Sequence, residues 1–140
     1  MQTEKLIVIG SGPAGLAAAL YTGRAGLNPL VLSGLEMGGQ ISLTYDVDNY
    51  LGFPEGTTGP ELIEMMTSHV NKFDARLQFE EVTEVDFKNG PPFTVSTHAQ
   101  KYQADAVIVA TGAAPRRLQV PGEEQYIGHG VSFCATCDGF

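Results

Sequence analysis

The strongest constraint on this chain is the glycine-rich run GSGPAG at residues 10–15, which lies between an apolar and an alanine-rich segment. Residues 6–9 (LIVI) are continuously apolar, as expected for a strand buried on both faces of a parallel sheet. Residues 16–25 favour a helix. A strand, a G-x-G-x-x-G turn and a helix in this order are typical of dinucleotide-binding folds, in which the helix N-terminus receives a pyrophosphate. A plain glycine-rich turn is the alternative, and the complete context argues against it.

A second short strand is predicted at residues 29–32, after Gly26 has ended the helix. The chain therefore opens as a strand–turn–helix–strand unit, the start of a doubly wound fold. Residues 33–57 are rich in glycine and polar side chains, so we expect mostly a loop. A loop of that length commonly holds a ligand.

A further helix is predicted after this loop, because Thr58 and Glu61 have the spacing of a capping box with a proline in the first turn. Leu62, Met65 and Met66 belong to an apolar helical face behind it. We therefore expect both methionines to fill the core.

The following segments indicate β structure through alternating patterns and turn residues. Short strands are expected at residues 77–79, 82–87, 93–97 and 101–104. Together they suggest a small antiparallel meander used as a crossover, after which residues 106–110 return to the pattern of a buried strand. The predicted fold class is α/β: a Rossmann-like domain with a parallel sheet, helices and an antiparallel β-meander crossover, followed by a linker that Pro115, Pro121 and Gly122 mark.

Charge and hydropathy exclude two classes of partner. Eight Lys plus Arg stand against sixteen Asp plus Glu, a net charge of -8, whereas a nucleic-acid binder needs a basic face. No apolar run approaches the roughly 20 residues that span a bilayer. We expect no nucleic-acid or membrane partner, and a cytoplasmic location.

The two cysteines, Cys134 and Cys137, are three residues apart in an otherwise cysteine-free chain. At this spacing both sulfurs can meet in one turn, so a small-loop disulfide can form and open. Asp138 follows directly and has the chemistry of a general acid–base toward a leaving thiolate. Half of a zinc site and two inert buried cysteines remain alternatives on these residues alone, although the three histidines lack metal-like spacing. We expect no metal site.

The residue that usually binds the ribose of a dinucleotide is missing. Ser33 stands at the end of the second predicted strand, where an acid is expected, and Glu36 follows three residues later. Glu36 has two interpretations of equal weight, a ribose ligand that reaches from a loop or a solvated loop carboxylate.

Together these segments resemble the low-molecular-weight thioredoxin reductases, members of the pyridine nucleotide-disulfide oxidoreductase family, along nearly the whole chain. In that family the strand-end acid is likewise absent. The resemblance implies an FAD site made of the fingerprint loop, a second flavin-contacting loop, an asparagine that faces the isoalloxazine, a main-chain contact to adenine and an A-T-G strand end. The implicated residues are Gly10, Ser11, Gly12, Pro13, Ala14, Gly15, Ser33, Glu36, Gly38, Gly39, Gln40, Asn49, Val82, Ala110, Thr111 and Gly112.

The segment CATCDG at residues 134–139 matches the family's redox signature. The resemblance implies that Cys137 is the sulfur nearest the flavin, that Cys134 is its partner and that Asp138 is the acid–base. The Ala-Thr interior favours thioredoxin reductase over related peroxide-reductase flavoproteins. The implied activity is that of a homodimeric thioredoxin-disulfide reductase that passes electrons from NADPH through FAD and the cysteine pair to thioredoxin.

The family's chains are more than twice this length, and no NADPH-binding motif is found here. We therefore expect residues 1–112 to form the N-terminal part of an FAD-binding domain, and residues 113–140 to form a linker and the start of the pyridine-nucleotide domain. We interpret the chain as a fragment or as one part of a split assembly. We expect that the isolated chain does not turn over NADPH. The alternatives are an FAD-binding module without turnover and a related disulfide flavoprotein with another electron donor.

Overall fold

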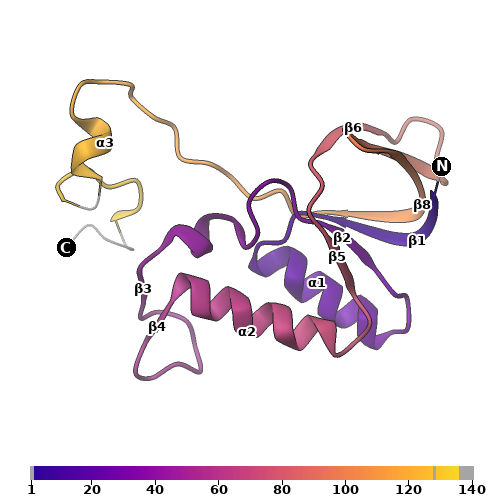
Figure 1. The fold of residues 1–140 in the computed structure, drawn as a ribbon, viewed down its shortest axis with the longest axis horizontal. Coiled ribbons are helices and arrows are strands. Elements are labelled where there is room, and N and C mark those ends of the chain that lie inside the picture. Colours follow the sequence, from indigo (N-terminus) through magenta and orange to yellow (C-terminus); the bar gives the residue numbers. More distant parts are fainter. Residues whose placement is uncertain (1, 128, 136–140) are drawn as a thin grey trace.

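A computed structural model describes residues 2–127 and 129–135, which form a mixed sheet flanked by helices (Figure 1). Within these residues the main sheet has the strand order β5-β2-β1-β8-β7-β6, and β3 and β4 form a separate pair. In chain order the elements are β1 Gln2–Ile9, α1 Pro13–Arg24, β2 Leu30–Leu32, the 3-10 helix η1 Gly39–Leu43, β3 Asp46–Val47, β4 Thr57–Thr58, α2 Gly59–Asn71, β5 Arg76–Gln78, β6 Val82–Asp86, β7 Phe93–Thr97, β8 Lys101–Val109 and α3 Glu123–Tyr126.

The parallel half of the sheet is centred on β1, which pairs in parallel with β2 and β8, while β5 extends the sheet beyond β2. Helices α1 and α2 cover one face of this half (Figure 1). The apolar cluster between them and the sheet consists of Val8, Leu16, Ala19, Val31, Ile63, Val70 and Ala75. The predicted strands at residues 6–9 and 29–32 and the helix between them are confirmed.

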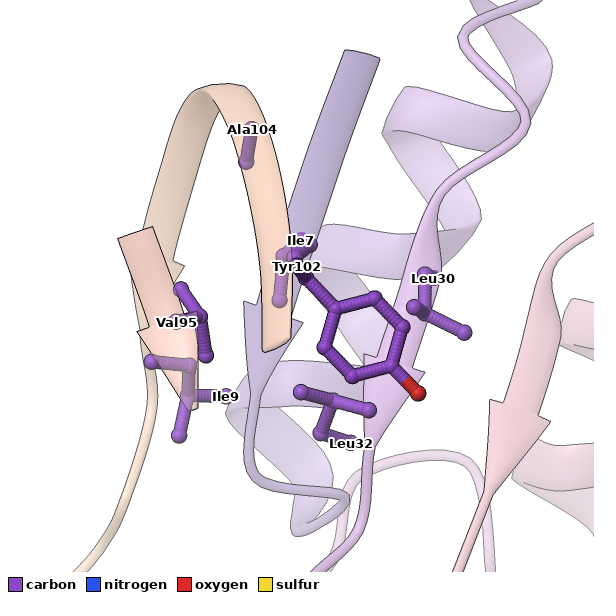
Figure 2. Close-up of a cluster of buried hydrophobic side chains, with 7 residues drawn as sticks. All are labelled: Ile7, Ile9, Leu30, Leu32, Val95, Tyr102 and Ala104. Atoms are coloured by element: carbon purple, nitrogen blue, oxygen red, sulfur yellow. The ribbon is translucent and has the colours of Figure 1, made fainter. Parts of the chain in front are cut away.

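The opposite face of the same strands is covered by the antiparallel β6–β7 hairpin together with the first half of β8. Its cluster consists of Ile7, Ile9, Leu30, Leu32, Val95, Tyr102 and Ala104 (Figure 2). Successive strand residues point to opposite faces, so Ile7 and Ile9 pack under the hairpin while Val8 packs under the helices. This double burial explains why residues 6–9 carry no polar side chain. The Rossmann-like α/β prediction is confirmed.

Two details of the β prediction are wrong. The strands expected at residues 101–104 and 106–110 are one strand, β8, which pairs with β1 along most of its length but with β7 only from Lys101 to Ala104. Among the described residues the second half of β8 therefore has a neighbour on one side only, and Val109 is 59% exposed where a buried side chain was expected. The strand expected at residues 77–79 is β5, an edge of the parallel sheet rather than part of a meander.

The capping box of α2 is confirmed, because the Thr58 hydroxyl accepts from the Glu61 N–H at 3.4 Å and the Glu61 carboxylate accepts from the Thr58 N–H at 3.1 Å. The expected core face is only partly right. Helix α2 turns Ile63 toward α1 and the sheet, so Met66 is partly buried there and Met65 is 45% exposed.

Candidate functional site

The glycine-rich loop lies where the carboxyl ends of the central strands meet. The Gly10 N–H donates to the Leu32 carbonyl at 2.8 Å, and the Ala110 N–H donates to the Ile9 carbonyl at 2.8 Å. These bonds bring the ends of β1, β2 and β8 together. Ligands of open α/β sheets bind in the crevice at this edge. The structure thus brings the predicted residues Gly10 and Ala110 together at the edge expected to bind a ligand.

Two of the loop glycines are required by close main-chain contact. Gly10 has a φ of +107°, which side-chain-bearing residues rarely adopt, and a Cβ placed there would overlap the Ala110 carbonyl oxygen. A Cβ at Gly15 would in turn overlap the Gly10 carbonyl oxygen. Because neither glycine has a side chain, the main chain of the turn can contact both the first turn of α1 and the end of β8 directly.

Gly12 differs from both, because its surroundings are open. A Cβ there would meet only the Gly38 carbonyl oxygen within 4 Å, at 3.8 Å, and its φ of -68° suits any residue. Gly12 is the N-cap of α1, whose first turn contains Pro13 and Ala14 and is not capped by a side chain. A helix start with uncapped N–H groups and open space in front of it fits an anionic pyrophosphate.

The second predicted loop is tied to the first by a buried hydrogen bond. Ser11 is 2% exposed, and its Oγ accepts from the Gly38 N–H at 3.2 Å. A Cβ at Gly39 would lie 3.7 Å from the Gly12 Cα, so this loop runs over the start of α1. The structure therefore places Gly38 and Gly39 against the glycine-rich turn, and Ser11 joins the two loops.

The other residues of the second loop divide into a buried and an exposed set. Ser33 is buried, and its hydroxyl donates to the Gln78 carbonyl at 3.1 Å or to the Gly34 carbonyl at 3.0 Å. Glu36 and Gln40 are exposed to solvent. The assignment of Glu36 as a ribose ligand stays a prediction.

The remaining predicted cofactor residues lie farther along the fold. Asn49 is exposed between β3 and β4, and Figure 1 shows this pair of strands beyond η1, so the structure does not place Asn49 against the glycine-rich turn. Val82 opens β6 and packs, partly buried, against the cluster under the hairpin. Thr111 and Gly112 are exposed just after β8, and Gly112 has a φ of +65°.

An extended stretch leads from β8 away from the sheet to α3 (Figure 1), and Cys134 follows α3 in the chain. Cys134, the one cysteine among the described residues, is partly buried and disulfide-bonded, and its N–H donates to the Ser132 Oγ at 3.1 Å. Cys137 and Asp138 lie outside the described residues. In the part of the chain that the structure describes, no three His, Cys, Asp or Glu residues form a group suited to a metal ion. No helix there is long and apolar enough to cross a membrane.

Two comparisons place the chain among known proteins. Residues 4–140 match the family described as "Pyridine nucleotide-disulphide oxidoreductase". The crystal structure of thioredoxin reductase from Streptococcus pyogenes MGAS5005 superimposes with a TM-score of 0.89 at 41% identity, over 98% of this chain and 44% of that one.

Two curated relatives of similar identity carry different names. Thioredoxin reductase from Mycolicibacterium smegmatis is 53% identical over 96% of this chain and 43% of its own length. Glucosaminate ammonia-lyase from Pseudomonas fluorescens is 46% identical over 98% of this chain and 42% of its own length. The chain thus spans less than half the length of these relatives, and sequence similarity alone does not distinguish the two names.

Proposed function

Because the chain belongs to the pyridine nucleotide-disulphide oxidoreductase family, we propose that the protein, in its native length, is a thioredoxin-disulfide reductase. The observation that carries this proposal is the combination of a pyrophosphate cradle at Gly12 with a disulfide-bonded Cys134 in the sequence CATCDG. A protein that only binds a dinucleotide has no use for such a pair. The net reaction converts NADPH, a proton and the disulfide of thioredoxin into NADP⁺ and the dithiol of thioredoxin.

The residues of the cradle fit FAD. The first turn of α1, beginning at Gly12, would receive the pyrophosphate, and residues 33–40 would form the second flavin-contacting loop, with Glu36 as its candidate ribose ligand. FAD, when bound, supplies the coupling between a two-electron hydride donor and thiol chemistry, which side chains cannot provide. NADPH would bind outside this chain. The further cofactor contacts at Pro13, Ala14, Asn49, Val82, Thr111 and Gly112 belong to the same proposal.

The redox step uses the cysteine pair. Cys134 and Cys137 form the disulfide in the oxidised state, and its reduction yields two thiols that then reduce the disulfide of thioredoxin. Cys137 is assigned as the sulfur nearest the flavin, and Asp138 as the group that protonates the leaving thiolate. Residues 1–112 belong to the FAD domain and residues 113–140 to the linker and the start of the pyridine-nucleotide domain, in a cytoplasmic homodimer.

The experiment compares the wild-type protein in its native length with Cys134→Ser and with the control Glu84→Gln, a substitution at an exposed residue of β6. We expect sustained NADPH consumption with oxidised thioredoxin for the wild type and the control, and none for Cys134→Ser. Release of ammonia from glucosaminate, measured in parallel, tests the activity named for the Pseudomonas fluorescens relative. A wild-type protein that releases ammonia and leaves thioredoxin oxidised would refute the proposal.

The 140-residue chain alone provides a second test. Because we place the NADPH site outside it, we expect no sustained NADPH consumption from the isolated chain with added FAD and thioredoxin. Turnover by this chain would show that the assignment of the electron-donor site is wrong.

A further inference from the structure

A polar cluster of five side chains joins the hairpin layer to the outer edge of the parallel sheet. Tyr102 on β8 is fully buried, with its ring beside Leu30 and Leu32 and its hydroxyl pointing past them (Figure 2). That hydroxyl donates to Glu80 at 2.9 Å or to Gln78 Oε1 at 2.8 Å. The full cluster is Gln78, Glu80, Thr97, Gln100 and Tyr102.

The carboxylate of Glu80 is the centre of this cluster. It accepts from the Thr97 hydroxyl at 2.6 Å, in addition to the Tyr102 hydroxyl, while the Gln100 amide donates to the Tyr102 oxygen at 2.6 Å. Charge-assisted hydrogen bonds of this kind are stronger than neutral ones. Glu80 thereby fixes the stretch between β5 and β6 against the hairpin.

The main chain of the same stretch holds the carboxyl end of β2. The Gln78 carbonyl accepts from the Ser33 N–H at 2.9 Å and also faces the Ser33 hydroxyl, and the Glu80 carbonyl accepts from the Gly34 N–H at 3.1 Å. The side chains of Gln78 and Glu80 are thus bound to Tyr102, while their carbonyls are bound to Ser33 and Gly34.

The carboxyl end of β2 is the place where dinucleotide-binding folds contact the ribose of the adenosine half, usually through an acid. Here the residue is Ser33, whose hydroxyl is committed to main-chain carbonyls. We propose that Glu80 and Tyr102 are positioning residues for the adenosine end of the cofactor, acting through residues 78–80 on Ser33 and Gly34. This inference rests on the proposed FAD site.

The protonation states of Tyr102 and Glu80 agree with their roles as hydrogen-bond donor and acceptor. Burial, together with the neighbouring Glu80 carboxylate, raises the pKa of Tyr102 to about 12, so the hydroxyl remains a donor at neutral pH. The hydrogen bond from Thr97 lowers the pKa of Glu80, so that side chain remains a carboxylate acceptor.

The first test is amide hydrogen exchange at Ser33 and Gly34, which needs no cofactor. Glu80→Gln keeps the size of the side chain and Tyr102→Phe keeps the ring, while Glu84→Gln on β6, which is exposed, is the matched control. We expect exchange at both amides to become about tenfold faster in the two variants, in line with loss of a hydrogen bond to a charged group. Unchanged exchange in Glu80→Gln would overturn the proposal.

The second test separates the adenosine end from the phosphate cradle. NMR titrations compare the binding of ADP, FAD and inorganic pyrophosphate to the wild type, Glu80→Gln and Glu84→Gln. We expect Glu80→Gln to weaken ADP and FAD binding about tenfold and to leave pyrophosphate binding unchanged. Equal weakening of pyrophosphate binding would indicate a general structural role and overturn the inference, as would unchanged ADP binding. A wild-type chain that binds neither ADP nor FAD would instead refute the proposed cofactor site, and this inference with it.

Discussion

The α/β body at residues 2–110 and the segment at residues 113–135 are held together by different interactions. In the body, both faces of the central strands are covered by apolar side chains, from the helices on one face and from the β6–β7 hairpin and the start of β8 on the other. Among the described residues of the segment, Glu123 alone is buried, and its carboxylate accepts from the N–H groups of Leu118 at 2.8 Å and Gln119 at 2.7 Å. Long-range packing therefore fixes the glycine-rich turn, and short-range hydrogen bonds fix the turn at residues 118–123 in the stretch that precedes Cys134.

The largest expected difference between the two regions comes from truncating an apolar side chain in each. Leu30→Ala removes a fully buried side chain from the body and should lower the free energy of unfolding by about 2–5 kcal/mol. Leu118→Ala removes a side chain that is 75% exposed and should change it by no more than about 0.5 kcal/mol. Urea unfolding measures the free energy of unfolding of both variants. Equal destabilisation by Leu30→Ala and Leu118→Ala would contradict the difference drawn between the body and the segment.

The glycine-rich turn is the next most sensitive point of the body. Gly10→Ala combines a φ of +107° with overlap of the Ala110 carbonyl, so we expect a loss of about 2–4 kcal/mol in the free energy of unfolding. Gly26→Ala is the matched control, because Gly26 has a φ of +73° but open space around it, and should lose only about 1–2 kcal/mol. Equal losses in thermal or urea unfolding would mean that the close approach at Gly10 contributes nothing.

Much of the body could be predicted from the sequence because its signals are local. The turn at residues 10–15, the strands on either side of α1 and the capping box at Thr58 each occupy a few consecutive residues. The prediction of two strands at residues 101–104 and 106–110 was wrong, because Asp105 interrupts the apolar run although the backbone continues as one strand. The face of α2 was partly misassigned, because its orientation depends on α1 and not on its own periodicity.

In the candidate site, too, the features with a local sequence signal could be predicted and those that depend on tertiary contacts could not. Its glycines follow from the fingerprint, whereas the bonds that fix the loops join residues far apart in the sequence. Examples are the Ser11–Gly38 bond and the Glu80–Tyr102 pair. Polar contacts of this kind have no periodic pattern, so they become visible only when the strands are placed side by side.

A smaller effect is expected at Glu123, through pH. Hydrogen bonds from the Leu118 and Gln119 N–H groups lower the pKa of Glu123 from 4.5 in the folded protein. Its stabilising contribution is therefore present above pH 4.5 and is lost as the pH falls through the lowered value. We expect amide exchange at Leu118 and Gln119, corrected for intrinsic rates, to lose protection in that acid range while β1 stays protected.

Glu123→Gln provides the control for this prediction. The variant should already lack part of the protection at Leu118 and Gln119 at neutral pH, and acid should change it less. Loss of protection in β1 at the same pH as in the segment would show that the two regions unfold together, against the contrast drawn above.

The central claim is that the open space at Gly12 is where the dinucleotide binds, and Gly12→Ala tests it most directly. An alanine fits there, since its Cβ would meet only the Gly38 carbonyl oxygen at 3.8 Å, so we expect a loss of stability of about 1 kcal/mol or less. FAD titration, followed by the flavin absorption spectrum, should show binding to the wild-type chain and at least about tenfold weaker binding to Gly12→Ala. Equally tight binding to both chains, or no binding to the wild type, would contradict the account.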